Sequence, residues 1–165
     1  MNFPLFFGVE VTAKLHGNAH ILIYGLPPEF VREFPDIYDY PLEKMARLVR
    51  ERGGLIVQAH PFRGGGSLLD LSQLDGVEVN CHPLYDATHC VRLLQIATEN
   101  GLLVTCGGDY HADTDYRPVC GTYFPDDAVS GDALVAHLKS ATEICLHVHE
   151  LRTEDHGDVT FVKSC

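Results

Sequence analysis

Residues 102–111 have the sequence Leu-Leu-Val-Thr-Cys-Gly-Gly-Asp-Tyr-His, in which an apolar run ends at two glycines, a carboxylate and an imidazole. The apolar run predicts a short buried strand, and the glycines permit a tight turn after it. Because residues i and i+2 of an extended segment point to the same side, Asp109 and His111 can meet one cation together. An isolated Asp-x-His is more often a solvated loop, so the choice between a loop and a metal site depends on the rest of the chain.

Strands and helices alternate on both sides of this stretch. Apolar runs are followed by helical periodicity and then by glycine, which predicts an α/β domain with a largely parallel sheet and helices outside it. The expected strands are 3–11, 19–25, 55–59, 76–80, 102–109, an irregular strand within 116–124, 144–149 and 159–162. The expected helices are a short turn at 29–34, a helix from Pro41 to the glycines at 53 and 54, 87–100, and a helix capped by Ser130 that runs to about residue 140.

The composition is that of one soluble globular domain, since 165 residues are 45% hydrophobic and 21% charged. No apolar run approaches the ~20 residues that span a bilayer, and the first residues lack the basic flank of a signal peptide. We therefore expect a cytoplasmic protein with no membrane partner. A net charge of −11, from 12 basic and 23 acidic residues, argues against a surface that binds nucleic acid. A small phosphorylated substrate remains compatible with this charge if bound cations reverse its sign locally.

The cysteines carry no metal or disulfide signature that the sequence makes visible. The six cysteines have no C-x-x-C spacing, and several lie in apolar or helical patterns. Buried thiols in a reducing compartment are therefore expected, in place of a disulfide framework. The ten histidines are many for this length, and we expect some of them to have a chemical role.

Four polar residues, Glu10, His60, Asp109 and His111, lie at or just past the expected strand ends, and His20 lies within an adjacent strand. In folds of this class functional groups gather at the carboxyl ends of strands. Three imidazoles and two carboxylates form a nitrogen and oxygen ligand set that suits divalent Zn, Mn or Fe. A hydrogen-bonded core histidine is the alternative for His20. The five candidates are Glu10, His20, His60, Asp109 and His111.

Several segments resemble, in the same order, the successive motifs of the PHP (polymerase and histidinol phosphatase) superfamily. The resemblance extends over about residues 8–140. Its most specific parts are the Ala-His-Pro-Phe-Arg and Gly-x-Asp-x-His segments. The segments are Gly-Val-Glu at 8–10, His20 ahead of Ile-Leu-Ile-Tyr-Gly, Ala-His-Pro-Phe-Arg at 59–63, Asp-Gly-Val-Glu-Val-Asn at 75–80 and Gly-Gly-Asp-Tyr-His at 107–111.

This resemblance implies a metal-dependent phosphoesterase, which hydrolyses a phosphomonoester or phosphodiester through a metal-activated water. The implied fold is a partial or distorted (β/α)7 TIM-like barrel with a mostly parallel sheet, in which residues 1–165 form a single N-terminally truncated domain. The metal ligands would be the five candidates above. Asp109, His111 and Arg63 would act in catalysis, and Arg63 would hold the substrate phosphate, unless it is simply a surface arginine.

The sequence also departs from the family pattern. The family's first His-x-His motif and a following Asp-His motif lie upstream of Gly-x-Glu, whereas this chain begins almost at Gly8. The His-x-His at His147 and His149 is either a circularly permuted replacement or a pair of strand histidines near a sheet edge. His82 and His89 are either substitute ligands or loop and helix-surface residues.

Three alternatives to a complete phosphoesterase follow from this departure. The chain could be a catalytically impaired metal-binding remnant, a subunit completed by a partner chain, or an amidohydrolase-like barrel that acts on a C–N bond. Missing strands would expose edge backbone groups, which predicts self-association.

Overall fold

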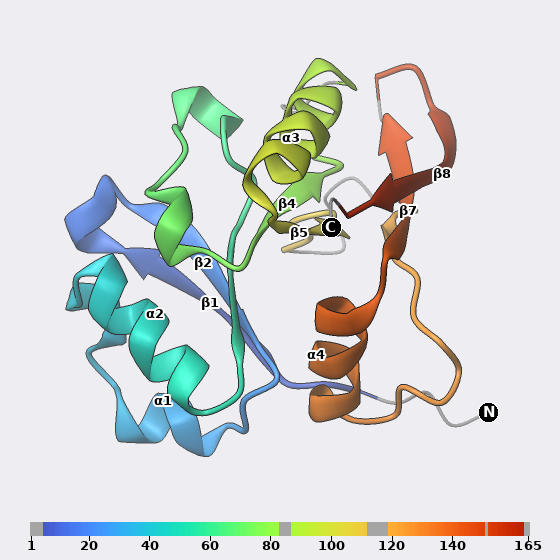
Figure 1. The fold of residues 1–165 in the computed structure, drawn as a ribbon. Coiled ribbons are helices and arrows are strands. Elements are labelled where there is room, and N and C mark those ends of the chain that lie inside the picture. Colours follow the sequence, from blue (N-terminus) through green and yellow to red (C-terminus); the bar gives the residue numbers. More distant parts are fainter. Residues whose placement is uncertain (1–4, 83–86, 112–118, 151, 164–165) are drawn as a thin grey trace.

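The computed structural model describes residues 5–82, 87–111, 119–150 and 152–163, which form two sheets and the helices around them (Figure 1). The strands are β1 (Gly8–Ala13), β2 (Ala19–Tyr24), β3 (Leu55–Gln58), β4 (Gly76–Asn80), β5 (Leu103–Gly107), β6 (Gly121–Thr122), β7 (Glu143–Glu150) and β8 (Asp155–Val162). The α-helices are α1 (Glu29–Glu33), α2 (Leu42–Glu51), α3 (Ala87–Asn100) and α4 (Gly131–Ser140).

The α/β class is confirmed, but the expectation of a partial (β/α)7 barrel with a mostly parallel sheet is wrong. The larger sheet has the order β1-β2-β3-β4-β5 and is mixed, because β2 pairs antiparallel with both β1 and β3, while β3, β4 and β5 are parallel. Residues 14–18 join β1 to β2, and so short a connection cannot make the crossover that parallel neighbours need. The two strands form a hairpin instead, and no closed barrel occurs within the described ranges.

The last three strands form a separate antiparallel sheet with the order β6-β7-β8. They pair with one another rather than extending the larger sheet, although β6 and β7 contact β5. In Figure 1, α1 and α2 lie on the same side of the view as β1 and β2, and β7 and β8 lie on the other side, beyond β5. Helix α4 packs next to the end of β2, where its Val135 side chain lies against Gly25. Of the irregular strand expected within 116–124, the structure shows β6, and residues 116–118 lie outside the described residues.

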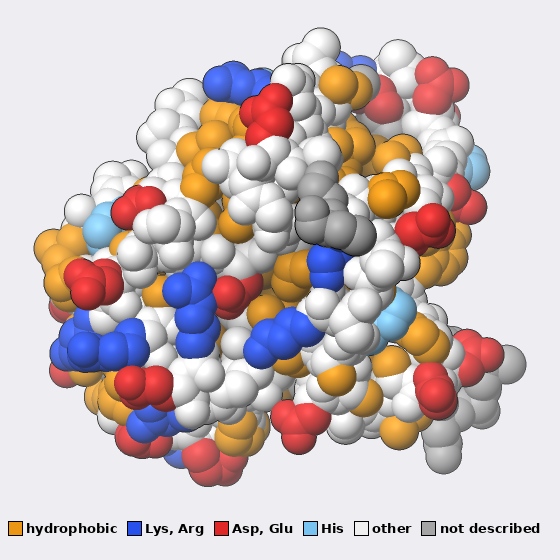
Figure 2. Space-filling model, viewed as in Figure 1, with side chains coloured by type: hydrophobic (Ala, Val, Ile, Leu, Met, Phe, Trp, Pro, Cys, Tyr) orange, Lys and Arg blue, Asp and Glu red, His pale blue; other side chains and the backbone are white. Residues whose placement is uncertain are grey.

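Helix α2 shows why the predicted helices form where they do. Its apolar positions Leu42, Met45, Ala46 and Val49 are all buried against the core, three or four residues apart, as an amphipathic helix requires. The opposite face is charged. Figure 2 shows Lys and Arg side chains interspersed with Asp and Glu on the molecular face that carries α1 and α2. The ion pair between Arg52 and Glu33 at 2.6 Å is one example of this mixing.

Two other helices match their predicted bounds. Helix α3 has the predicted range, and α4 begins after Ser130, whose hydroxyl accepts a hydrogen bond from the Ala133 N–H at 3.1 Å. Among the residues that the structure describes, none of the helices combines the length and apolar character needed to cross a bilayer.

Candidate metal centre

The β1–β2 hairpin brings Glu10 and His20 together. In its register Glu10 lies opposite Leu22 and His20 lies opposite Thr12, so both residues point to the same face of the sheet. One Glu10 carboxylate oxygen, Oε1, lies 2.5 Å from His20 Nδ1. The His20 side chain is 36% exposed, so His20 lies at the edge of the core and is not the hydrogen-bonded core histidine of the alternative interpretation.

His60 joins this pair from the end of β3. The Ala59 N–H donates to the His20 carbonyl at 3.0 Å, which fixes the segment just before His60. His60 Nε2 then lies 3.2 Å from His20 Nδ1 and 3.4 Å from Glu10 Oε1. We call Glu10, His20 and His60 the Glu–His–His group; each offers a ligand atom, and these atoms lie within 4.8 Å of one another.

Glu78 on β4 positions the Glu–His–His group through a hydrogen bond to the backbone of His60. Its carboxylate is buried, and Oε2 accepts hydrogen bonds from the His60 N–H at 3.1 Å and from the Asn80 side-chain amide at 3.2 Å. Burial raises the pKa of Glu78 to about 7, against the effect of these hydrogen bonds, which favour the charged form. The hydrogen bond between the His60 N–H and Glu78 holds His60 in an uncommon backbone conformation, with φ of 29°. Glu78 is thus a positioning residue. No role was predicted for it, although a glutamate within the apolar strand Gly-Val-Glu-Val-Asn was an available signal.

The chemistry of the Glu–His–His group fits a divalent cation. Hydrogen bonding from His60 and the proximity of His20 hold the pKa of Glu10 below its ordinary value, so the carboxylate is available as a charged ligand. One carboxylate oxygen with two imidazole nitrogens is a common donor set for Zn²⁺ and related metals. A cleft of about 600 Å³, lined by residues 16–20 and 58–67, opens beside His20 and His60 and gives room for a substrate.

Asp109 and His111 lie together but outside the Glu–His–His group. The Asp109 side chain is only 4% exposed and forms an ion pair with Arg63, which lines the same cleft. The His111 side chain is 70% exposed, and its Nδ1 lies 2.8 Å from the Asp109 carbonyl oxygen and 3.7 Å from its carboxylate. Of the five predicted ligands the structure therefore brings three into one group, and Asp109 and His111 are not part of it.

The other histidines considered from the sequence do not belong to this group. His147 and His149 are both on β7; His147 Nδ1 lies 2.7 Å from Asp158 Oδ1, and His149 Nδ1 accepts the Val119 N–H at 3.0 Å. They are strand histidines with partners of their own, and nothing in the described ranges joins them to the Glu–His–His group as a permuted motif would require. The remaining two are His82, whose N–H donates to Asn80, and His89, whose ring lies 5.9 Å from that of Phe62.

The sequence matches no family model and no curated protein. Its fold is similar to that of PsfC from Pseudomonas syringae, with a TM-score of 0.57 and 21% identity over 71% of this chain. The match covers 48% of PsfC, so the chain spans about half the length of that protein. The fold is also similar to that of a proposed metal-dependent phosphoesterase from Bifidobacterium adolescentis, with a TM-score of 0.53 and 19% identity over 82% of this chain and 76% of that one. At these identities the likeness shows a shared fold.

Proposed function

We propose that this chain is a metal-dependent phosphoesterase of the PHP type, which hydrolyses a phosphomonoester or a phosphodiester. The observation that carries the proposal is the convergence of Glu10, His20 and His60, from three strands or strand ends, on one point beside an open cleft. The shared fold with a proposed metal-dependent phosphoesterase supports the same class of reaction.

The Glu–His–His group would hold a divalent cation, for which Mn²⁺, Zn²⁺ and Fe²⁺ are the candidates. Such a cation, when bound, supplies a water of lowered pKa and neutralises charge on the phosphoryl oxygens. Asp109 and His111 would complete the ligand set. Asp109 can do so once its carboxylate exchanges Arg63 for a cation, and His111 is exposed and adjacent.

Arg63 would bind the substrate phosphate. A guanidinium offers paired N–H donors that match two phosphate oxygens, and this one lines the cleft beside His60. In the structure its charge instead balances the buried Asp109 carboxylate. The proposed exchange therefore frees both partners at once: Asp109 becomes a ligand and Arg63 turns to the phosphate.

A second candidate is a metal-binding protein without turnover. It is favoured by the pairing of Asp109 with Arg63, which leaves three ligands in the close group. Such a protein would bind one cation through the Glu–His–His group and gain stability from it.

The two candidates are separated by metal content and hydrolysis measured on the same sample. Purified protein is stripped with chelator, reloaded with Mn²⁺, and assayed with p-nitrophenyl phosphate and bis(p-nitrophenyl) phosphate. Mn²⁺ is chosen because thiolates bind it poorly, so cysteines do not add to the count. Hydrolysis that depends on bound Mn²⁺ supports the phosphoesterase, whereas one bound ion without hydrolysis supports the second candidate.

Variants then test the residues. Glu10→Gln and Asp109→Ala are each expected to lower hydrolysis by more than about 100-fold, since even residues that only support metal ligands typically cost 10-fold to 100-fold. His156→Ala on β8, an exposed histidine, serves as the control and should leave hydrolysis unchanged. Full activity of Asp109→Ala would overturn its assignment as a ligand.

A further inference from the structure

Three cysteines from separate segments meet at the other side of the same sheet. Cys81 follows β4, Cys106 lies in β5, and Cys120 precedes β6. Their sulfur atoms all lie within 4.8 Å of one another, and those of Cys81 and Cys106 are 3.8 Å apart. We call these three residues the cysteine group. It was not predicted, because the three residues are far apart along the chain and have no C-x-x-C spacing.

The cysteine group is separate from the Glu–His–His group. Cys106 lies opposite Val79 in the parallel register of β4 and β5, so it shares a face with Val79 and with Cys81, two residues further on. Glu78 alternates to the opposite face, where it supports His60. The two groups therefore lie on opposite faces of the sheet near the carboxyl ends of its strands.

Hydrogen bonds from the smaller sheet hold the cysteine group in position. The His149 N–H donates to the Cys81 sulfur at 3.2 Å, and the Cys106 thiol lies 3.3 Å from the His147 carbonyl oxygen. The same His149 accepts the Val119 N–H, which fixes the residue next to Cys120. Cys106 lies within β5, and Cys81 and Cys120 each lie next to a strand, so three separate strands position the group.

The spacing of the sulfur atoms suits a thiolate metal site better than a disulfide. Four tetrahedral ligands at a Zn–S distance of about 2.3 Å place neighbouring sulfurs about 3.8 Å apart, and Cys81 and Cys106 have this separation. A disulfide needs an S–S distance of about 2.05 Å and can use only two of the three sulfurs.

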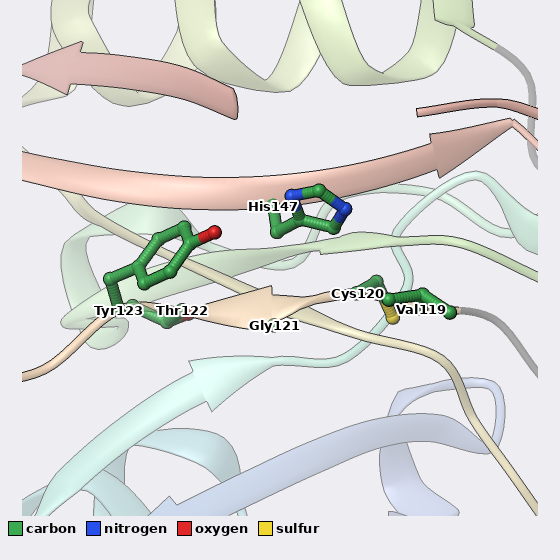
Figure 3. A pocket seen from close by; sticks show the side chains of 6 residues that line it. All are labelled: Val119, Cys120, Gly121, Thr122, Tyr123 and His147. Carbon is green, nitrogen blue, oxygen red and sulfur yellow. The ribbon is translucent and has the colours of Figure 1, made fainter. Parts of the chain in front are cut away.

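We propose that Cys81, Cys106 and Cys120 form a second metal site, which binds Zn²⁺ through three thiolates. Binding releases the thiol protons and joins the ends of β4 and β5 to the segment before β6, so it links the two sheets. Three protein ligands leave a fourth position for water or a small ligand. Cys120 lines a cavity of about 280 Å³ together with Tyr123 and His147. Figure 3 shows Cys120 and Tyr123 at opposite ends of β6, with His147 on the neighbouring strand.

Cobalt substitution tests the proposal without reference to enzyme activity. Full-length protein is reduced, stripped with chelator and titrated with Co²⁺, and a thiolate-to-cobalt charge-transfer band in the near ultraviolet is expected, which Zn²⁺ then abolishes. Cys81→Ser and Cys120→Ser should remove most of this band. Cys145→Ser, a half-buried cysteine outside the group, and Glu10→Gln should both retain it. Absence of the band in the wild-type protein, or its persistence in Cys120→Ser, would overturn the proposal.

A second measurement on the wild-type chain covers the case in which a cysteine variant fails to fold. Zn²⁺ should slow alkylation of Cys81, Cys106 and Cys120 by at least about tenfold relative to Cys145, as read by mass spectrometry of the labelled peptides. X-ray absorption of the zinc-loaded Glu10→Gln protein should give sulfur scatterers at about 2.3 Å. Equal alkylation with and without Zn²⁺ would refute the site, as would a Cys81–Cys106 disulfide in freshly purified protein that binds no zinc.

Discussion

The carboxylate of Glu78 occupies the space that a side chain at position 107 would need. A Cβ built on Gly107 would approach Glu78 Oε1 more closely than real Cβ atoms approach any atom. The other oxygen of the same carboxylate accepts the His60 N–H. The absence of a side chain at Gly107 is therefore linked, through Glu78, to the position of a candidate metal ligand.

Gly107→Ala tests this linkage. The new methyl group is expected to displace the Glu78 carboxylate, which costs about 1–3 kcal/mol of the free energy of unfolding and weakens Mn²⁺ binding because the support of His60 is lost. Urea denaturation and metal titration measure the two effects. Gly121→Ala is the matched control, since Gly121 is also in a strand and has open space where its Cβ would lie. If Gly107→Ala and Gly121→Ala have the same free energy of unfolding and the same Mn²⁺ affinity, the Glu78 carboxylate is not needed where the structure places it.

Glu78→Gln is expected to change how stability depends on pH in the metal-free protein. The pKa of Glu78 is raised by burial from 4.5 to about 7, so the native state keeps its proton to a higher pH than the unfolded chain does. The free energy of unfolding therefore falls as the pH rises from 4.5 to about 7, and this contribution amounts to about 3 kcal/mol. Glutamine does not titrate, so the free energy of unfolding of Glu78→Gln lacks this fall. The variant should therefore become more stable relative to wild type as the pH rises over that interval.

Urea denaturation in chelator at several pH values measures this difference. The exposed Glu99 provides the control, because Glu99→Gln changes the same charge on the surface of α3. If Glu78→Gln and wild type show parallel pH profiles, the Glu78 carboxyl does not titrate in the predicted range.

Gly25→Ala should be much more destabilising than Gly53→Ala. Both glycines have positive φ, 78° and 84°, so alanine costs about 1 kcal/mol of backbone strain at either position. At Gly25 the new methyl group would also overlap the Val135 side chain of α4, whereas nothing lies near it at Gly53. This overpacking should lower the free energy of unfolding by about 1–3 kcal/mol more. Thermal or urea unfolding measures both variants, and the difference between their losses reports the contact between α4 and the end of β2. If Gly25→Ala and Gly53→Ala lose the same free energy of unfolding, α4 moves to make room for the methyl group without cost.

Local structure could be predicted from the sequence because apolar periodicity and capping are local signals. The strand at 76–80 and the helix at 87–100 have their predicted bounds, and Ser130 caps α4 as expected. Strand pairing could not be predicted in the same way. The resemblance favoured a barrel of parallel strands, whereas the short connection at residues 14–18 favoured a hairpin, and the hairpin is what the chain forms.

The candidate site was accessible from the sequence only in part. Glu10 and His20 lie close together because a hairpin joins them, so their proximity follows from local geometry. The ion pair of Asp109 with Arg63 and the meeting of Cys81 with Cys106 depend on which distant strands become neighbours. Periodicity carries no information on such pairings, which is why neither the ion pair of Asp109 with Arg63 nor the meeting of the cysteines was predicted.

Arg63→Met removes the positive charge that balances the buried Asp109 carboxylate. The metal-free variant should lose up to about 3–5 kcal/mol of the free energy of unfolding, because the buried Asp109 carboxylate loses its guanidinium partner. A cation that binds Asp109 would restore the balance, so Mn²⁺ should raise the melting temperature of the variant more than that of wild type. The apparent affinity for Mn²⁺ should rise, since the cation no longer competes with Arg63.

The same substitution should have the opposite effect on substrate. If Arg63 binds the phosphate, KM for a phosphomonoester rises in Arg63→Met although the metal is held more tightly, and Arg63→Lys, which keeps the charge but not the paired donors, gives intermediate values. A gain in metal affinity without a change in KM would restrict Arg63 to neutralising Asp109. An equal Mn²⁺ shift of the melting temperature in variant and wild type would show that Asp109 does not exchange Arg63 for the cation, and the Glu–His–His group would then bind metal without it.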